Sequence, residues 1–239
     1  MSEKLLKIAE QLAAQVESLK FSLPIHTIYN PLVYAKASHF DYLSKYGIGR
    51  KKVVFMGMNP GPWGMSQTGV PFGEIAAVKD WLKIAGEVKK PKKEHPKRKI
   101  EGFECKKSEV SGRRLWGLFK DRFGKPDHFF KNHFVLNYCP LVFMEESGRN
   151  FTPDKLPAGE QKPLMEYCDQ HLKRVVEILD PEWVVGVGKY AAGRAESVLR
   201  NTDIKVDWVL HPSPASPAAN RDWSGQATQK LEALGIWQK

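Results

Sequence analysis

The segment that most constrains this fold is a glycine- and proline-rich stretch, residues 57–74, directly after a short apolar run. The run Val53-Val54-Phe55-Met56 has the length and composition of a buried strand. Glycine lets the backbone approach a ligand closely, and proline fixes the path of the chain. Open α/β sheets bind ligands at such loops, beyond the carboxyl ends of their strands. The stretch therefore predicts an α/β fold with a ligand site at this loop.

The rest of the chain alternates strand-like and helix-like patterns. We expect an amphipathic N-terminal helix at about residues 3–19, and then buried strands at 53–58, 134–138, 183–187 and 206–210. The helical patterns that follow or separate the strands cover 74–85, 114–123, 164–179, 191–199 and 226–234. Strands that alternate with helices predict a parallel sheet covered on both faces. Since no repeat or interdomain linker is visible, we predict one domain over residues 1–239.

Composition narrows the cellular setting. The chain has 239 residues, 42% of them hydrophobic, which is enough for one substantial core. No apolar run approaches the roughly 18 residues of a membrane span, and the N-terminus lacks the apolar region of a signal peptide. We therefore expect an intracellular protein with no membrane partner, cytoplasmic in a prokaryote and nuclear in a eukaryote.

Cysteine and histidine usage bears on metals and redox chemistry. The three cysteines are far apart and odd in number, which argues against a disulfide framework and fits a reducing compartment. No Cys-x-x-Cys pair is present, and the seven histidines are scattered. The sequence thus indicates neither a zinc site nor an iron–sulfur cluster, and no cofactor is expected.

The positive charge of the chain is concentrated in one segment. The net charge is +10, and residues 89–107 carry nine basic and three acidic side chains. Two interpretations stay open: a solvated, mobile loop, or an arm that contacts phosphates through residues such as Lys97 and Arg98. The second gains weight only if the site chemistry involves nucleic acid, because many basic proteins bind none.

Polar or glycine-bearing segments follow all four expected strands. They are the loop with Asn59, then Asn137, the Gly186-Val187-Gly188 strand end, and the segment from His211 to Pro217. Parallel strands bring their carboxyl ends to one edge of a sheet. We therefore expect Asn59, Asn137 and His211 to converge there.

The side chains of this set limit its chemistry. The chain has no Gly-x-Ser-x-Gly elbow and no phosphate loop, and Gly186-Val187-Gly188 lacks the third glycine of a dinucleotide fingerprint. An asparagine amide can read a base edge that offers both a donor and an acceptor, and a histidine can stabilise an anion. Phe72 can stack on a planar ligand. The set suits recognition of a flat heterocycle that leaves as an anion, without a metal or covalent nucleophile.

Each of these residues also has a purely structural interpretation. A lone asparagine often serves turn geometry, a lone histidine is often only hydrogen-bonded, and Phe72 alone would be assigned to the core. The combination with two proline-stiffened loops favours a functional interpretation.

The same residues carry a family resemblance. The segments Gly57-Met58-Asn59-Pro60-Gly61-Pro62 and Gln67 to Glu74 resemble the single-strand-selective monofunctional uracil-DNA glycosylases. The segment from His211 to Pro214, with Ala219, Asn220 and Trp223, is similar to the second motif of that family. Further similar segments are 94–98, 108–112, 147–150 and 184–188, so the resemblance covers about residues 25–225. It implies a three-layer α/β/α fold around a central four-stranded parallel sheet.

The resemblance implies a role for each residue at the strand ends. Asn59 would position the water that attacks the sugar C1′, and His211 would stabilise the uracil anion at O2. Asn137 would read uracil through N3–H and O4, which excludes cytosine. Phe72 would stack on the flipped base, and the main-chain N–H groups of Met58 and Phe72 would add contacts.

The implied reaction is removal of uracil from DNA, single- or double-stranded, by a monomer that leaves an abasic site. No lysine nucleophile is implied, so the strand stays intact. Enzymes of the superfamily that accept only uracil place a bulky aromatic residue against pyrimidine C5, where this chain has Gly61. We therefore also expect activity on 5-hydroxymethyluracil.

The second motif is expected to contact DNA through a proline-rich loop. In the family this loop often carries an arginine and then an asparagine that help to push the base out, but this chain has Ala215 and Ser216 there. The resemblance thus implies a shorter, uncharged wedge and weaker activity on double strands, with Arg221 compensating through phosphates. The expected contact residues of the loop are Pro212, Ser213, Pro214, Ala215 and Ser216.

Two alternatives stay open on the sequence. A mismatch-type uracil or thymine glycosylase shares the Gly-x-Asn-Pro-Gly core but lacks the histidine of the second motif, so His211 argues against it. A non-catalytic module that binds damaged DNA through the basic segment is the other.

Overall fold

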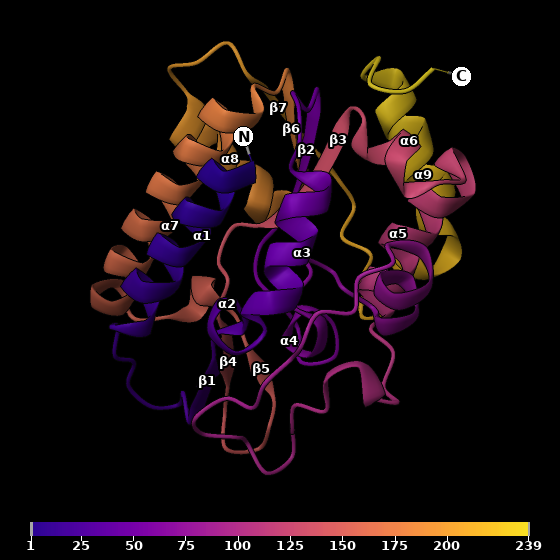
Figure 1. The fold of residues 1–239 in the computed structure, drawn as a ribbon. Helices are drawn as coiled ribbons and strands as arrows, with labels where there is room; N and C mark the ends of the chain where they lie inside the picture. Colours follow the sequence, from indigo (N-terminus) through magenta and orange to yellow (C-terminus); the bar gives the residue numbers. More distant parts are fainter. Residues whose placement is uncertain (1, 239) are drawn as a thin grey trace.

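A computed structural model describes residues 2–238, which fold around a four-stranded parallel sheet (Figure 1). Its strands are β2 (Val53–Gly57), β3 (His133–Asn137), β6 (Trp183–Val187) and β7 (Lys205–Val209), in the order β3-β2-β6-β7. All three neighbouring pairs are parallel. The four strands predicted from apolar runs are therefore confirmed to within one residue at each end.

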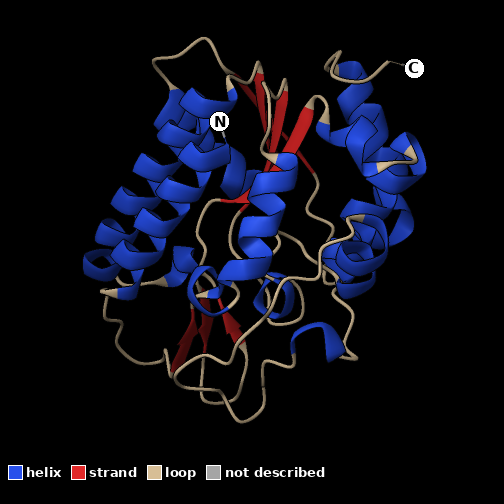
Figure 2. Ribbon diagram, in the orientation of Figure 1, coloured by secondary structure: helices blue, strands red, loops and turns tan. Residues whose placement is uncertain are grey.

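Helices cover both faces of this sheet. On one side lie α1 (Ser2–Glu17), α7 (Ala158–Leu179) and α8 (Lys189–Leu199), and on the other lie α5 (Val110–Phe123), α6 (Pro126–Phe130) and α9 (Pro217–Ala233) (Figures 1 and 2). Helix α3 (Lys36–Tyr46) packs against α1. The expected three-layer α/β/α fold around a central four-stranded parallel sheet is thus confirmed.

The main core forms where the strands meet the helices. Every residue of β2 is buried, as expected of a strand covered on both faces. Helix α1 buries Leu5, Ile8, Leu12 and Val16, whose spacing of three and four residues forms one apolar stripe. Buried residues of the larger sheet and of helices on both faces belong to one continuous cluster. The prediction of a single domain is in keeping with this cluster and stays a prediction.

A second, three-stranded antiparallel sheet was not predicted. It consists of β1 (Thr27–Tyr29), β4 (Val142–Met144) and β5 (Asn150–Phe151), in the order β1-β4-β5, and lies below the larger sheet in Figure 1. Strands of two or three residues are too short to show a periodic pattern. The paired residues of β1 and β4 are also more than a hundred positions apart in the sequence, so these strands are defined only by pairing in the folded chain.

Several helix boundaries differ from the sequence prediction. The helix expected at 74–85 is wrong in length: its regular part is a π-helical turn at Ala77–Trp81, and Lys83 has a φ of 54°. The last helix begins at Pro217 and is kinked at Asp222, where φ is −162°. The remaining short helices are α2 (Pro31–Tyr34), α4 (Met65–Thr68) and 3₁₀ turns at Gly102–Glu104 and Pro153–Lys155.

Two further observations complete the fold. Within residues 2–238, no helix is long and apolar enough to cross a bilayer. Cys105, Cys139 and Cys168 are buried and unpaired.

Candidate functional site

The expected site lies where β2 ends. A β-carbon on Gly57 would stand 2.5 Å from Asn137 Oδ1 and 2.6 Å from two ring carbons of Phe72. Only glycine lets these two side chains approach the strand end so closely. Asn137 ends the neighbouring strand β3, so the parallel register places it beside Gly57. Phe72 and Asn137 therefore border one space.

His211 joins this space from the far edge of the sheet. It follows β7, and the centroid of its ring lies 6.3 Å from that of Phe72. Gly188, with a φ of 101°, makes room for it: a β-carbon there would lie 3.3 Å from His211 Cβ. Phe72, Asn137 and His211 thus come together although 139 residues separate the first from the last.

The side chain of Asn59 is oriented by hydrogen bonds that its amide nitrogen donates. Nδ2 donates to Leu141 O at 3.1 Å and to Pro60 O at 3.4 Å. The strand exit before it is fixed by Cys139 N–H, which donates to Met58 O at 2.8 Å. Because Nδ2 donates to these two carbonyls, Oδ1 remains free to accept a hydrogen bond from a water or a substrate.

Phe72 adopts a backbone conformation that non-glycine residues rarely take, with a φ of 52°. Two contacts of α5 hold it. Trp116 Nε1 donates to Pro71 O at 3.2 Å, and a β-carbon on Gly112 would collide with Phe72 O. Within residues 2–238, the N–H groups of Met58 and Phe72 donate to no other loop or turn group of the chain. Strain stored at such a position is common at ligand sites.

The loop of residues 57–74, hereafter the first loop, has a polar interior. Ser66, Gln67 and Thr68 are fully buried. Ser66 Oγ donates to Gly61 O at 2.6 Å, Gln67 Nε2 donates to Pro62 O at 3.1 Å, and Thr68 Oγ1 donates to Gly73 O at 2.9 Å. Buried polar groups that all find partners fix one backbone path, so the first loop is preorganised.

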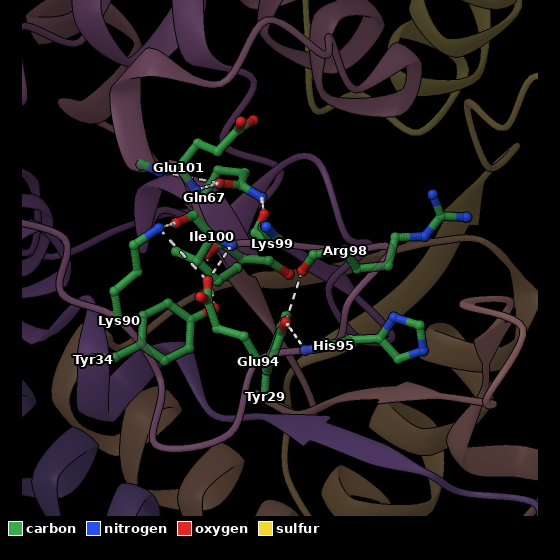
Figure 3. A network of polar contacts seen from close by, with 12 residues as sticks. Tyr29, Tyr34, Gln67, Lys90, Glu94, His95, Arg98, Lys99, Ile100 and Glu101 are labelled. Atoms are coloured by element: carbon green, nitrogen blue, oxygen red, sulfur yellow. Dashed lines mark hydrogen bonds and ion pairs between the residues drawn. The ribbon is translucent and has the colours of Figure 1, made fainter.

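Gln67 also ties the first loop to the basic segment (Figure 3). Its Nε2 donates to Lys99 O at 3.0 Å, and its Oε1 accepts from Glu101 N–H at 2.8 Å. Tyr29 holds the same segment, since its hydroxyl donates to Arg98 O at 2.6 Å. The interpretation of residues 89–107 as a mobile loop is therefore wrong for residues 98–102, whose backbone is held by these bonds.

The side chains of the two basic residues assigned to DNA differ in freedom. Lys97 is exposed, whereas Arg98 is partly buried. Arg98 Nε donates to Gly148 O at 2.8 Å, and its guanidinium carbon lies 5.0 Å from the ring centroid of Trp63. The remaining nitrogens of Arg98 can bind a phosphate beside the first loop.

The segment from His211 to Pro217, hereafter the second loop, is more exposed. Pro214 and Ala215 are exposed, Ser213 and Ser216 are partly buried, and Pro212 is buried. Ser216 caps α9 by accepting a hydrogen bond from Ala219 N–H at 3.3 Å. Arg221 is exposed on the same helix.

The first turns of α5 contact both loops, which the sequence did not reveal. Arg114 Nη1 donates to Pro212 O at 3.2 Å, and its Nη2 donates to Asn220 Oδ1 at 2.8 Å. Ser111 Oγ donates to Pro212 O at 3.4 Å. On the other side, a β-carbon on Gly61 would lie 2.8 Å from Glu109 Oε1. The space beside Gly61 is thus bounded by a carboxyl group.

A signal for these residues was present in the sequence. The segment 108–112 belongs to the family resemblance, yet no chemical role followed from it. An expected helix start at Arg114 left it in a loop, whereas α5 begins at Val110.

The electrostatics of the site favour neutral groups. Burial lowers the pKa of His211, so its imidazole is uncharged at neutral pH and can donate one N–H. Burial, and then the nearby Glu74 carboxylate, raise the pKa of Glu109 to about 7. In the described part of the chain, no group of three or more histidine, cysteine or acidic residues is placed to hold a metal.

Taken together, the arrangement offers one oriented amide oxygen, one aromatic face, one amide edge and one neutral imidazole. Such groups can stack on a flat heterocycle, accept a hydrogen bond at Asn59 and donate one near His211.

Comparisons with known proteins show what this chain is similar to. The family model of the uracil DNA glycosylase superfamily matches residues 44–234. The single-strand selective monofunctional uracil-DNA glycosylase of Rattus norvegicus is 47% identical over 238 residues, covering 99% of this chain and 86% of that protein. Its Mus musculus counterpart is 46% identical over 238 residues, covering 99% and 85%. The crystal structure of Pedobacter heparinus SMUG2 superposes with a TM-score of 0.65 at 15% identity, covering 96% of this chain and 99% of that one.

Proposed function

The chain belongs to the uracil DNA glycosylase superfamily, and we propose that it hydrolyses the N-glycosidic bond of uracil in DNA. It is a monofunctional enzyme of DNA repair, so its product is an abasic site in an uncut strand. A glycosylase must extrude its target base before reacting with it. The space bordered by Phe72 and Asn137 is the place for that base.

The observation that carries this proposal is the meeting of Phe72, Asn137 and His211 beside the end of β2, two residues before Asn59 in the sequence. Cleavage builds positive charge on the sugar and negative charge on the leaving base. Asn59 has no carboxylate to take a proton, so we assign it the orientation of the attacking water through Oδ1. Leaving-group stabilisation then contributes most of the rate.

His211 is suited to that stabilisation because burial keeps its imidazole neutral. A neutral N–H can donate to uracil O2 as charge develops there. In a site shielded from water, one such donor is typically worth about 10²- to 10³-fold in rate.

Asn137 supports selection of uracil over cytosine. Its amide offers an acceptor for N3–H and a donor for O4, and cytosine presents the opposite pattern on both atoms. Asn137 is held in place because the next residue, Tyr138, donates its hydroxyl to Asp169 Oδ1 at 2.5 Å and its N–H to Gly57 O at 2.8 Å.

Different residues of the site argue against the two alternatives. A mismatch-type glycosylase has no histidine in the second motif, whereas His211 lies 6.3 Å from Phe72 between ring centroids. A non-catalytic module that reads DNA through the basic segment has no need of the strained Phe72 or the oriented Asn59.

Finer features remain part of the proposal. We propose that the enzyme accepts single strands readily and double strands less well, because Ala215 and Ser216 give the second loop a short, uncharged tip. We also propose that it removes 5-hydroxymethyluracil, acts as a monomer, and resides where DNA is kept in the cell.

The decisive test incubates the protein with oligonucleotides that contain one uracil, in single- and double-stranded form, followed by alkali. Cleavage at uracil only after alkali supports a monofunctional glycosylase. Binding without an abasic product would support the non-catalytic module instead. A panel with 5-hydroxymethyluracil, thymine and cytosine then defines the substrate range, and Gly61→Tyr should lose 5-hydroxymethyluracil.

A further inference from the structure

A carboxylic acid with no assigned role stands beside the proposed base site. Glu109 is the residue just before α5, but its side chain makes no capping hydrogen bond to the helix. It turns instead toward the first loop, where β-carbons on Gly61 and Gly64 would both collide with its oxygens. A β-carbon on Gly112 would lie 2.9 Å from Glu109 Oε2. Three glycines therefore surround this one carboxyl group.

The carboxyl group is short of partners. Among the described residues, Oε2 is buried and has no hydrogen-bond partner. Its neighbour Glu74 differs, since Glu74 Oε2 accepts from Ala77 N–H at 2.9 Å and Oε1 accepts from Ser108 Oγ at 3.0 Å. A buried polar atom left without a partner costs about 1–3 kcal/mol, which indicates a missing ligand group.

The position of Glu109 relative to the base follows from the order of atoms around uracil. In the proposed orientation, O2 of the base faces His211, and N3 and O4 face Asn137. C5 follows C4 in the ring, so it lies beyond Asn137, on the side away from His211. Met65 Sδ lies 3.3 Å from Asn137 Nδ2, the atom assigned to O4, so Met65 stands at the O4 end of the amide, next to C5. Met65 directly follows Gly64, which touches Glu109. The C5 edge of the base therefore faces the part of the first loop that Glu109 supports.

We propose that Glu109 recognises the substituent at pyrimidine C5 and hydrogen-bonds the hydroxyl of 5-hydroxymethyluracil. This inference rests on the proposed function, because it assigns a residue to the selectivity of the same site. A hydroxyl both donates and accepts, so it can pair with either oxygen of a carboxylic acid. The methyl group of thymine can do neither and would leave the buried oxygen unpaired. Sites built to hydrogen-bond a substrate hydroxyl discriminate strongly against analogues that lack it.

The test compares excision of uracil and 5-hydroxymethyluracil from the same single-stranded oligonucleotide under single-turnover conditions. In Glu109→Met, which keeps length but removes both oxygens, the ratio of 5-hydroxymethyluracil to uracil rates should fall about tenfold, the loss of one hydrogen bond. Glu109→Gln keeps a donor and an acceptor and should hold the ratio within about twofold. Glu104→Met, at an exposed site in the preceding segment, is the matched control and should leave the ratio unchanged.

The outcomes separate the two proposals. Equal losses on both bases in Glu109→Met, or a ratio in Glu109→Gln as low as in Glu109→Met, would overturn the role of Glu109. Wild-type protein that excises uracil but not 5-hydroxymethyluracil would also overturn it and leave the proposed function intact. If wild type excises neither base, the proposed function itself fails. Should Glu109→Met not fold, Glu109→Asp withdraws the acid by one methylene and should give the same selective loss.

Discussion

The two loops that form the site are stabilised in different ways. The first loop has a buried polar interior in which Ser66, Gln67 and Thr68 are fully enclosed and hydrogen-bonded. The second loop is more exposed and is held chiefly by hydrogen bonds from Arg114 and by the helix cap at Ser216.

The difference matches what each loop is proposed to contact. The first loop surrounds the base, and reading a base requires groups fixed to within a fraction of an ångström. The second loop contributes one residue, His211, to the base and otherwise faces the DNA strand, whose shape varies between substrates. The loop with the more hydrogen-bonded interior is thus the one that is proposed to surround the base. Five predictions test this contrast, from the largest expected effect to the smallest.

The two loops should not differ in the rate that is lost when the residue assigned to the reaction is removed from each. Asn59→Ala and His211→Ala should each lower the single-turnover rate on uracil about 10²- to 10³-fold, because each removes one group that acts on the transition state. Both side chains are only partly buried, so the melting temperature should stay near that of wild type. Normal rates in both variants would refute the assignment.

The two loops should differ in the free energy of unfolding that is lost when a side-chain hydrogen bond is removed from each. Gln67→Ala deletes hydrogen bonds to Pro62, Lys99 and Glu101 in a buried place and should lower the free energy of unfolding by about 3 kcal/mol. In the second loop, Ser213→Ala removes one bond to Ala215 N–H and should cost less than about 0.5 kcal/mol. Urea denaturation measures both, and equal losses would contradict the contrast.

A single added methyl group on α5 should disturb the first loop. Gly112→Ala places a β-carbon against the backbone of Phe72, so the free energy of unfolding should fall by about 2 kcal/mol and uracil excision should fall with it. Gly117→Ala on the same helix is the control, since no atom outside the adjoining helix backbone lies within 4 Å of a β-carbon there. That variant should be slightly more stable than wild type, because alanine favours helices over glycine.

Acid should weaken the support of the first loop. His39 is buried, its Nδ1 lies 2.8 Å from Gly69 O, and burial lowers its pKa to about 4. In the unfolded chain its pKa is near 6.5, so its contribution is complete above that pH and is lost as pH falls from about 6.5 towards 4. Between pH 6.5 and 5.5 this residue alone should cost about 1 kcal/mol.

The measurement compares urea denaturation at the two pH values. His133 and His171, whose pKa values burial also lowers to about 4, add to the same loss. His39→Gln should show a shallower pH dependence than wild type. The exposed His128 serves as control, and an equal change of slope in His128→Gln would contradict the assignment.

The smallest effect is expected at the exposed edge of the second loop. Arg221→Ala should weaken binding of double-stranded DNA a few-fold and reduce its salt dependence, because one phosphate contact is lost. The free energy of unfolding should not change, since the side chain is exposed. Fluorescence anisotropy at two salt concentrations measures both quantities, and an unchanged salt slope would remove Arg221 from the interface.

Much of the fold could be predicted because its signals are local. The strands of the larger sheet are continuous apolar runs, and the parallel topology follows from their alternation with helices. The small sheet could not be predicted, since β5 has two residues and its partners are defined by pairing across the fold.

The candidate site shows the same division. Asn59, Asn137 and His211 stand directly at or after strand ends, which a sequence displays. Gln67 and Glu109 act through contacts with segments more than thirty residues away. The residues next to them in the sequence do not predict those contacts.

The sequence by itself determined the four strands of the larger sheet, the family, and the residues that stand at or after the ends of those strands. These follow from local hydrophobicity and from residue type at strand ends. Only the tertiary structure decided how the first loop, residues 57–74, keeps its path: Gln67 binds it to the basic segment, and α5 presses Gly112 and Glu109 against it. The physical reason is that burial and hydrogen-bond satisfaction are properties of the packed chain, set by neighbours that are distant in the sequence.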